Sequence, residues 1–410
     1  MDRRLTITIV DDDEEVARLM GKVLTAAGHK VEILSSSVGA ITRLLIAPPD
    51  LLLVDIMMPE VDGLELTKKL REIEGLAAMR IIVVSGKAYE FDQKRARLLG
   101  ADGFIQKPVQ AATLAAQVER IVEDKMNLTY WGVRGTLPAP GPQSVRYGGN
   151  TSCVTIEYSD ARLLIFDAGT GIRMLGNHLL SRGRPRLDAK ILISHPHWDH
   201  INAFPFFKPL YIPGNEFEVM GPIHGDKSMH ELVAAQMDDV FFPITLKELG
   251  ARMLFRDLRQ QTFTVFRDIE IKTLLLSHPG YCLGYRVFYK GRSISYITDN
   301  ELYLPDHPSY NQKYLNDLVQ FVSGTDVLIT DCTYTDAEYK TRVGWGHSCV
   351  TRVAEFAAAA KVKSLHLFHH DPDQDDDAID RKFADVSSAL KALGSEVVCL
   401  APSEGSGFQI

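Results

Sequence analysis

Three histidines and one aspartate crowd the stretch "ISHPHWDH", which covers residues 193–200. The stretch closes the apolar run "KILI" and has the spacing H-x-H-x-D-H. Imidazole and carboxylate donors without thiolate suit Zn²⁺, Mn²⁺ or Fe. The spacing predicts a metal site in which His195 and His197 face one ion, while Asp199 and His200 face another.

Further metal donors close later apolar runs. His278 closes "IKTLLLSH", Asp299 closes "SISYITD", and His369 and His370 close "SLHLFHH". Two ions about 3.5–4 Å apart need a bridging carboxylate, as in many phosphoesterase sites, and Asp299 is the candidate bridge. A lone histidine is usually an ordinary core or surface residue. The combination of the H-x-H-x-D-H turn with three more strand-end donors makes that alternative weak.

Polar side chains follow apolar runs in the first quarter of the chain as well. Asp11 and Asp12 follow "LTITIV", Asp55 ends "LLLVD", Ser85 ends "RIIVVS" and Lys107 ends "GFIQK". Three carboxylates in one cleft repel each other unless a hard cation such as Mg²⁺ lies among them. Because that cation also neutralises an incoming phosphoryl group, one aspartate becomes a candidate nucleophile that forms an aspartyl phosphate. The lysine and the serine would then contact the phosphoryl oxygens.

The elements that must position these residues have two different patterns. Up to about residue 125, short apolar strands alternate with helical stretches, which predicts an α/β domain with a doubly wound parallel sheet and ligands at the carboxyl ends of its strands. From residue 126 onward the chain is richer in strands, and peripheral helical patterns predict an αββα sandwich. We therefore expect two domains, 1–125 and 126–410. The segment 203–262 has no clear motif.

Composition limits the classes of partner. The chain has 410 residues, 45% of them hydrophobic, and a formal net charge of −8, which disfavours a large polyanion such as nucleic acid as the main ligand. The five cysteines form no C-x-x-C pair, which fits a reducing cytosol. No apolar run approaches the ~20 residues of a membrane span, and the start lacks a signal-peptide pattern. A cytoplasmic protein without membrane contact is expected.

The first part strongly resembles the receiver domain of bacterial response regulators, which has a flavodoxin-like fold. The matching pieces are "IVDDD", "LLLVDIMMPEVDG", "VVSG" and "FIQKP", across about residues 4–124. The resemblance implies a cognate sensor histidine kinase as partner and, because receivers often pair, a homodimer. It also implies these roles: phosphoacceptor Asp55; Mg²⁺ ligands Asp11, Asp12 and Asp55; switch contacts Ser85, Lys107 and Phe104.

The second part resembles the metallo-β-lactamase fold superfamily over about residues 128–410, through the H-x-H-x-D-H motif. The resemblance implies two divalent transition metal ions, Zn²⁺, Mn²⁺ or Fe. It implies these ligands: His195, His197 and His278 on the first ion; Asp199, His200 and His369 on the second; Asp299 on both. The choice between His369 and His370 is open, and "HLFHH" favours His369.

Other pieces resemble ribonuclease Z and related phosphodiesterases. They are "YWGVRGT" (130–136), "GGNTSC" (148–153), "DAGTG" (167–171), "WGHS" (345–348) and "LHLFHHDP" (365–372). The resemblance makes His347 a proton donor or oxyanion contact at the phosphate, although it could instead cap its helix, a role that suits Ser348 better. Asp167 either orients a ligating histidine or forms the turn before Gly169.

Together the two resemblances predict a two-component response regulator whose output domain is a binuclear metal-dependent phosphodiesterase, regulated by phosphorylation at Asp55. Asp199 would orient the attacking water or accept its proton, and His347 would stabilise or protonate the leaving oxygen. Because a receiver implies a signalling output, the expected substrate is a small signalling phosphodiester such as a cyclic nucleotide.

Other functions stay open at this stage. The first alternative is a ribonuclease Z-like RNA endonuclease, against which we see no basic arm for gripping tRNA. The second is a hydrolase of a carbonyl ester, lactone or β-lactam. A metal-stabilised partner module without turnover is a third. A diiron redox enzyme of the same scaffold would carry glutamate where His197 stands.

Overall fold

The computed structural model of the protein describes residues 4–76, 79–86, 92, 95–96, 98–123, 125–182, 186–240 and 242–410. The chain forms two compact units. One runs to Lys125 and includes Tyr158–Ala161, and the other comprises Met126–Glu157 and Arg162–Ile410. Every helix among the described residues is too short or too polar to span a lipid bilayer.

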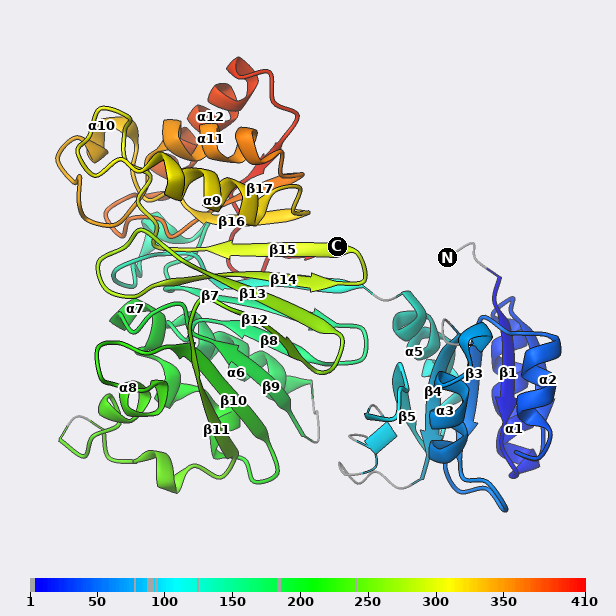
Figure 1. Ribbon diagram of the computed structural model, residues 1–410. Coiled ribbons are helices and arrows are strands. Elements are labelled where there is room, and N and C mark those ends of the chain that lie inside the picture. Colours follow the sequence, from blue (N-terminus) through cyan, green and yellow to red (C-terminus); the bar gives the residue numbers. More distant parts are fainter. Residues whose placement is uncertain are drawn as a thin grey trace. The chain divides into compact units, whose positions relative to one another are not determined.

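The first unit is a five-stranded parallel sheet in the order β2-β1-β3-β4-β5 (Figure 1). The strands are β1 (Thr6–Val10), β2 (Lys30–Leu34), β3 (Leu51–Asp55), β4 (Arg80–Ser85) and β5 (Gly103–Gln106). The described helices are α1 (Glu14–Ala26), α2 (Ala40–Ile46), α3 (Gly63–Arg71) and α5 (Ala111–Glu123), with a 3₁₀ turn η1 (Glu74–Leu76). The doubly wound sheet predicted from the sequence is confirmed.

Two separate cores hold this sheet between its helices. One core joins α1 and α5 to one face, and the other joins α2 and α3 to the opposite face. Helix α1 begins where the Asp13 side chain accepts hydrogen bonds from the N–H groups of Glu15 and Val16. Its buried residues recur every three or four positions, as at Ala17, Met20 and Leu24, which gives the helix one apolar side.

The second unit contains two seven-stranded mixed sheets (Figure 1). The first sheet has the order β11-β10-β9-β8-β7-β6-β19 and consists of β6 (Met126–Gly132), β7 (Cys153–Tyr158), β8 (Leu163–Phe166), β9 (Asp188–Leu192), β10 (Glu216–Pro222), β11 (Arg252–Leu258) and β19 (Gly407–Gln409). The second has the order β12-β13-β14-β15-β16-β17-β18 and consists of β12 (Thr262–Val265), β13 (Ile269–Leu275), β14 (Leu283–Tyr289), β15 (Arg292–Ile297), β16 (Val327–Asp331), β17 (Ser364–Phe368) and β18 (Val398–Leu400).

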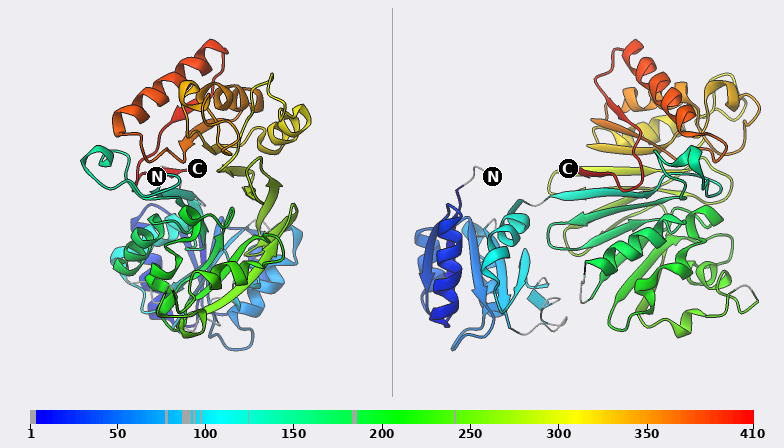
Figure 2. Two further views of the ribbon diagram at one scale, coloured as in Figure 1. Left: turned by 90° about the vertical axis from the view of Figure 1, so that its left-hand side faces the viewer. Right: turned by 180° about the vertical axis from the view of Figure 1, so that it is seen from behind.

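Helices cover the outer faces of both sheets (Figure 2). The first sheet packs against α6 (Gly171–Ser181) and α8 (Met229–Ala235), and the second against α9 (Gln312–Val322), α11 (Val350–Ala360) and α12 (Asp376–Ala392). The short helices are α7 (Trp198–Ile201), α10 (Asp336–Tyr339), η2 (Pro142–Ser144), η3 (Phe204–Phe206), η4 (Lys208–Tyr211) and η5 (Leu246–Glu248). The predicted αββα sandwich is confirmed.

A layer of buried aromatic rings joins the inner faces of the two sheets. Phe166 of β8 lies with its ring centre 5.1 Å from that of Tyr296 of β15 and 6.1 Å from that of Tyr285 of β14. Tyr130 of β6 packs in the same way 6.1 Å from Phe368 of β17. These large apolar surfaces fix the distance between the sheets, and with it the distance between the strand ends that carry the polar residues.

The segment 203–262 has more structure than its sequence indicated. It supplies β10 and β11, which extend the first sheet as a parallel pair beyond β9. The segment also supplies α8, and Ser228 and Glu231 form a capping box at its start. The C-terminal strand β19, which pairs antiparallel with β6, was also missed.

Candidate active site

The H-x-H-x-D-H turn follows β9 and is held by backbone hydrogen bonds from both sheets. The N–H of Ile193 donates to the carbonyl of Met220 in β10 over 2.7 Å. The N–H of Leu283 in β14 donates to the carbonyl of Ser194 over 2.9 Å. The backbone therefore places the turn where the two sheets meet.

Four donors from three chain segments form the first cluster. The ligand atoms of His195, His197, His278 and Asp299 all lie within 4.8 Å of one another. Nε2 of His278 lies 3.2 Å from Nδ1 of His197. Oδ2 of Asp299 lies 3.6 Å from Nε2 of His195 and 3.8 Å from Nε2 of His278. His197 is the exposed member, so the cluster is open to solvent on its side.

The second cluster contains Asp199, His200, Asp299 and His369, again within 4.8 Å of one another. Oδ1 of Asp299 lies 3.2 Å from Nε2 of both His200 and His369. Oδ2 of Asp199 lies 3.1 Å from the same two nitrogens. The two oxygens of Asp299 thus face different clusters, which is the position of a bridging carboxylate.

Buried ring nitrogens in both clusters lack a hydrogen bond. Nε2 of His195 has no hydrogen-bond partner among the described residues. Nε2 of His200 lies 3.1 and 3.2 Å from the carboxylates of Asp199 and Asp299, but without hydrogen-bond geometry. A buried polar atom without a partner costs free energy unless another species binds it. Imidazole and carboxylate groups are also the donor set that Zn²⁺ and Mn²⁺ take. The residues therefore fit two divalent cations.

The three histidines of the first cluster are kept neutral, which is the form that binds a metal. Burial lowers the pKa of His195 well below its usual value. Burial also lowers the pKa of His197 and of His278. Neutral imidazole is the ligand form, so no proton has to leave before these rings bind a cation.

The carboxylates of the second cluster require positive charge beside them. Burial alone would raise the pKa of Asp299, but His369, His200 and His195 outweigh burial and hold it well below its usual value. Burial alone would lower the pKa of His200, but Asp199, Asp299 and Asp167 outweigh burial and raise it well above its usual value. A divalent cation among these groups would supply such compensating charge.

Asp167 holds His200 from the side away from the cluster. Its Oδ2 lies 2.7 Å from Nδ1 of His200 and accepts a 2.8 Å hydrogen bond from the Tyr296 hydroxyl. Its Oδ1 accepts a 2.7 Å hydrogen bond from the N–H of Ser194. A carboxylate on the far nitrogen fixes the orientation of a ligating histidine. Of the two roles considered for Asp167, the geometry supports this one.

His278 and His369 are held by close backbone approach at two glycines. Nδ1 of His278 lies 3.0 Å from the carbonyl oxygen of Gly346, and a Cβ on Gly346 would lie 2.2 Å from that nitrogen. Nδ1 of His369 lies 3.2 Å from Oγ1 of Thr333, and a Cβ on Gly135 would lie 2.0 Å from the ring. Only glycine leaves room for the rings at these positions.

Three site residues adopt a left-handed backbone conformation shortly after a strand. The φ angles are 58° at Asp167, 44° at Asp299 and 58° at His369. Such angles are uncommon outside glycine and cluster at functional sites. Here they turn the chain at the strand end, so that each side chain points into the space between the sheets.

His347 lies beside the second cluster and is paired with Asp331. Its Nδ1 lies 2.7 Å from Oδ2 of Asp331, and its ring centre lies 4.8 Å from that of His369 and 5.3 Å from that of His278. Burial alone would lower the pKa of His347, but Asp331, Asp299 and Asp199 outweigh burial and raise it to about 9. Helix α11 begins after Cys349 without a side-chain cap, so neither His347 nor Ser348 serves as its cap.

In the first unit, the polar residues predicted at the strand ends also lie together. Asp11, Asp12 and Asp55 have carboxylate oxygens within 4.8 Å of one another. Nζ of Lys107 lies 2.9 Å from both Asp11 and Asp55, and the Lys107 N–H donates to the carbonyl of Ser85 over 2.8 Å. Burial raises the pKa of Asp11 despite the nearby lysine, and the Asp55 carboxylate adds a smaller contribution in the same direction.

Comparison with known protein families assigns both units. The response regulator receiver domain family matches residues 7–119. The beta-lactamase superfamily domain matches residues 162–370, half of the chain. The chain belongs to the beta-lactamase superfamily. Its second unit is a metal-dependent hydrolase of that superfamily, fused to a response regulator receiver domain.

The receiver domain is similar to curated response regulators. It is 31% identical over 119 residues to the polar-differentiation response regulator DivK of Brucella ovis, which covers 29% of this chain and 97% of DivK. It is 32% identical over 116 residues to the alkaline phosphatase synthesis transcriptional regulatory protein PhoP of Bacillus subtilis, covering 28% of this chain. The match spans about half of PhoP, 48% of its length.

The superfamily domain is similar in fold to a solved structure. The metallo-beta-lactamase fold protein YhfI from Bacillus subtilis aligns with a TM-score of 0.50 and 17% sequence identity. The alignment covers 70% of this chain and 100% of YhfI. The sequence match to the family and this structural similarity therefore agree on the fold of the second unit.

The beta-lactamase-superfamily site includes one residue that the sequence analysis did not select, Asp331. Its signal was present, because "VLITD" is an apolar run that closes on an aspartate, as "SISYITD" is. His370, the alternative to His369, lies outside both clusters, and its ring is fully buried next to Tyr147. The structure thus brings His369, and not His370, to the second cluster.

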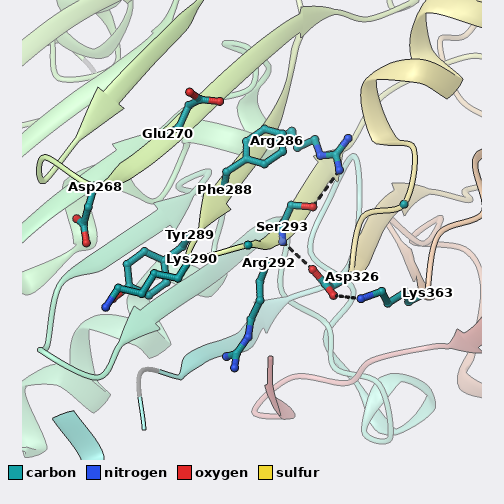
Figure 3. Close-up of a pocket in the computed structure, with 12 residues that line it drawn as sticks. Asp268, Glu270, Arg286, Phe288, Tyr289, Lys290, Arg292, Ser293, Asp326 and Lys363 are labelled. Carbon is teal, nitrogen blue, oxygen red and sulfur yellow. Dashed lines mark hydrogen bonds and ion pairs between the residues drawn. The ribbon is translucent and has the colours of Figure 1, made fainter. Parts of the chain in front are cut away.

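A polar pocket at the other end of the second sheet is separate from this site (Figure 3). It includes Arg292, the first residue of β15, whereas Asp299 follows the last residue of that six-residue strand, about 20 Å away. Its charges already pair: Lys363 lies 2.7 Å from Asp326, which also accepts from the N–H of Ser293. We assign this pocket no part in the chemistry.

Proposed function

We propose that the superfamily domain is a binuclear metal-dependent phosphodiesterase that acts on a small signalling phosphodiester and is regulated by phosphorylation of the receiver domain at Asp55. The observation that carries the proposal is the position of Asp299, whose two oxygens face two groups of histidines. Two adjacent cations that share one carboxylate are a recurrent arrangement in phosphoester hydrolysis.

Each cation would have its own protein donors. They are His195, His197 and His278 for one ion, Asp199, His200 and His369 for the other, and Asp299 for both. The donor set suits Zn²⁺ or Mn²⁺, and also Fe. When bound, the cations supply Lewis acidity, which stabilises charge on the phosphoryl oxygens and makes water nucleophilic near neutral pH.

Asp199 would accept the proton of the attacking water. The N–H of Thr136 donates a 2.7 Å hydrogen bond to its Oδ2, which also faces His200 and His369. This fixed oxygen orients the carboxylate, and the other oxygen is left for the water. A positioned carboxylate of this kind contributes by general base catalysis.

His347 is placed to bind the phosphate and to protonate the leaving oxygen. Because Asp331 engages Nδ1, Nε2 is the atom that can reach substrate. The ring packs against His369 and His278, one from each cluster, so it lies beside both metal positions. A donor held there stabilises charge that develops in the transition state.

The receiver domain would accept a phosphoryl group on Asp55 from a sensor histidine kinase. Asp11 and Asp12 would hold Mg²⁺ together with Asp55, and Lys107 and Ser85 would contact the phosphoryl oxygens. Phe104 packs against the core beneath α2 and α3. It would be the aromatic switch residue that responds to phosphorylation of Asp55. Phosphorylation would thereby alter substrate turnover in the superfamily domain.

Turnover of chromogenic substrates by protein of measured metal content tests the proposal. We expect hydrolysis of bis(p-nitrophenyl) phosphate and of cyclic nucleotides, a change in rate on adding acetyl phosphate, and no comparable hydrolysis of nitrocefin or lactones. Asp199→Ala should abolish turnover while retaining the fold, and Asp317→Ala, which removes an exposed carboxylate paired with Lys313 on α9, is its matched control. Cleavage of precursor tRNA with steep salt dependence, or of carbonyl esters alone, would contradict the proposal.

A further inference from the structure

Two tryptophans beside the metal clusters expose their indole rings to solvent. The chain has three tryptophans. Trp131 is partly buried, and its indole N–H donates to Thr155. Trp198 is 80% exposed and Trp345 is 61% exposed. A group of large exposed apolar side chains indicates a binding surface, whereas a single scattered one does not.

Both tryptophans lie next to residues of the first cluster. Trp198 stands between His197 and Asp199 in the chain. Trp345 precedes Gly346, whose carbonyl oxygen lies 3.0 Å from Nδ1 of His278. Because Nε2 of His278 lies 3.2 Å from Nδ1 of His197, the two tryptophans belong to segments that meet at the first cluster, and His197 is the exposed member of that cluster.

The backbone beneath each indole is firmly held. Trp198 begins α7, and its carbonyl accepts a 2.7 Å hydrogen bond from the N–H of Asn202. On the other side, the buried carboxylate of Glu301 accepts hydrogen bonds from the N–H groups of Gly344 and Gly346, over 2.7 and 2.8 Å. The main chain at both tryptophans is therefore fixed, and their exposed side chains are carried on held backbone.

We propose that Trp198 and Trp345 stack on the base of a nucleotide whose phosphodiester lies at the metal clusters, so that they select substrates carrying a planar ring. This inference rests on the proposed phosphodiesterase function and names its substrate class. Aromatic side chains stack on any base, because every base has a π face. The net charge of −8 disfavours a long polyanion, so the ligand is a mononucleotide or dinucleotide rather than an RNA chain.

The first experiment measures binding without turnover, through tryptophan fluorescence. The probes are the phosphorothioate analogues of 3′,5′-cyclic AMP and cyclic GMP, and a linear diadenylate. We expect each to quench the fluorescence of the metal-loaded protein, and we expect the Trp198→Ala and Trp345→Ala variants each to bind about tenfold more weakly or worse. Trp→Phe at each position should restore most of the affinity, since phenylalanine still offers a π face.

The second experiment compares a nucleotide diester with glycerophosphocholine, a phosphodiester without a planar ring. The ratio of kcat/KM for the nucleotide to kcat/KM for the ring-free diester should fall about tenfold or more in each alanine variant. Leu393→Ala removes a half-exposed apolar side chain at the end of α12 and should leave this ratio unchanged.

The outcomes separate this inference from the function on which it rests. Nucleotide quenching that depends on the two tryptophans, without hydrolysis of any diester, would support stacking and contradict the phosphodiesterase function. Diester hydrolysis with an unchanged substrate ratio and unchanged nucleotide affinity in both alanine variants would overturn stacking and leave the function standing. Binding of tRNA in preference to the small nucleotides would also overturn the inference.

Discussion

Oδ2 of Asp331 lies 2.7 Å from Nδ1 of His347. The other oxygen of Asp331 accepts a 2.8 Å hydrogen bond from the hydroxyl of Thr333, whose Oγ1 lies 3.2 Å from Nδ1 of His369. One buried carboxylate therefore orients both the residue assigned to the phosphate and, through Thr333, a residue assigned to the metal. Asp331 acts on the reaction through its neighbours and is a positioning residue.

Replacing Asp331 with asparagine should lower kcat on bis(p-nitrophenyl) phosphate about 10–100-fold, the usual cost of losing a carboxylate behind an active-site histidine. Metal content, measured by atomic absorption, should stay near that of the wild type. Adding His347→Ala to this variant should cost little more, because the two residues act as one unit. Independent, multiplying losses in the double variant would contradict the pairing.

Removing Asp299 should disturb both metal positions, because its two oxygens face different clusters. We expect Asp299→Ala to bind far less than two equivalents of Zn²⁺ and to lose turnover. His197→Ala, which removes a donor from the first cluster only, should retain about one equivalent. Equal metal loss in the two variants, measured on dialysed protein, would argue against a shared carboxylate.

Asp167→Asn should weaken metal binding without removing a ligand. The carboxylate takes hydrogen bonds from His200, Ser194 and Tyr296 in a fully buried position, and an amide cannot serve all of them. We expect metal affinity to fall about 10–100-fold and the unfolding free energy of the metal-free protein to fall by roughly 1–3 kcal/mol. A metal titration with the wild-type dissociation constant would refute the orienting role.

His366 predicts part of the dependence of stability on pH. Burial lowers its pKa to about 4, and its ring pairs with the hydroxyl of Tyr130 over 2.6 Å. Below the ordinary histidine pKa of about 6.5, the unfolded chain binds a proton that the folded chain does not. The contribution of His366 is therefore complete above pH 6.5 and is lost as pH falls toward 4, by on the order of 3 kcal/mol.

Urea unfolding of the metal-free protein at several pH values measures this effect. The difference in unfolding free energy between pH 6.5 and pH 4 should be smaller in His366→Asn by about that amount. Comparison of the two proteins cancels the titration of the other histidines. An identical pH dependence in both would show that His366 is protonated in the folded state.

Asp55→Asn tests the link from the receiver domain to turnover. Acetyl phosphate with Mg²⁺ should change kcat/KM of the wild type and leave that of the variant unchanged, because asparagine cannot form the acyl phosphate. Asp62→Asn, a change at the cap of α3, is a matched control that should retain the response. A response that persists in Asp55→Asn would place the phosphoryl group elsewhere.

The repeating patterns of the sequence predicted most of the fold. Apolar runs that stop at a polar residue form the receiver strands and the ends of β9, β13, β15 and β17. The type of element and the position of its polar residue could therefore both be predicted. The pair β10 and β11 could not, because charged residues interrupt both strands, "EFEVMGP" and "RMLFRDL", so neither stands out as an apolar run. Strand β19 is three residues long and exists through its pairing with β6, which lies at the opposite end of the superfamily domain's sequence.

The site was less completely predictable. The choice between His369 and His370 depends on a left-handed backbone angle at His369, which adjacent identical residues do not reveal. Asp331 could be recognised only when its distance to His347 was known. The exposure of Trp198 and Trp345 could not be predicted, because it depends on how the turns fold. A tryptophan in a sequence more often belongs to the core.

Activity as a function of metal occupancy tests the central claim most directly. Zn²⁺ or Mn²⁺ is added stepwise to metal-free protein, and bound metal and the rate of bis(p-nitrophenyl) phosphate hydrolysis are measured at each step, with the Asp11→Asn variant used to weaken uptake by the receiver domain. The account predicts that turnover rises mainly with the second equivalent bound and reaches a plateau at two per superfamily domain. Full activity with one ion, or no turnover at any occupancy, would contradict it.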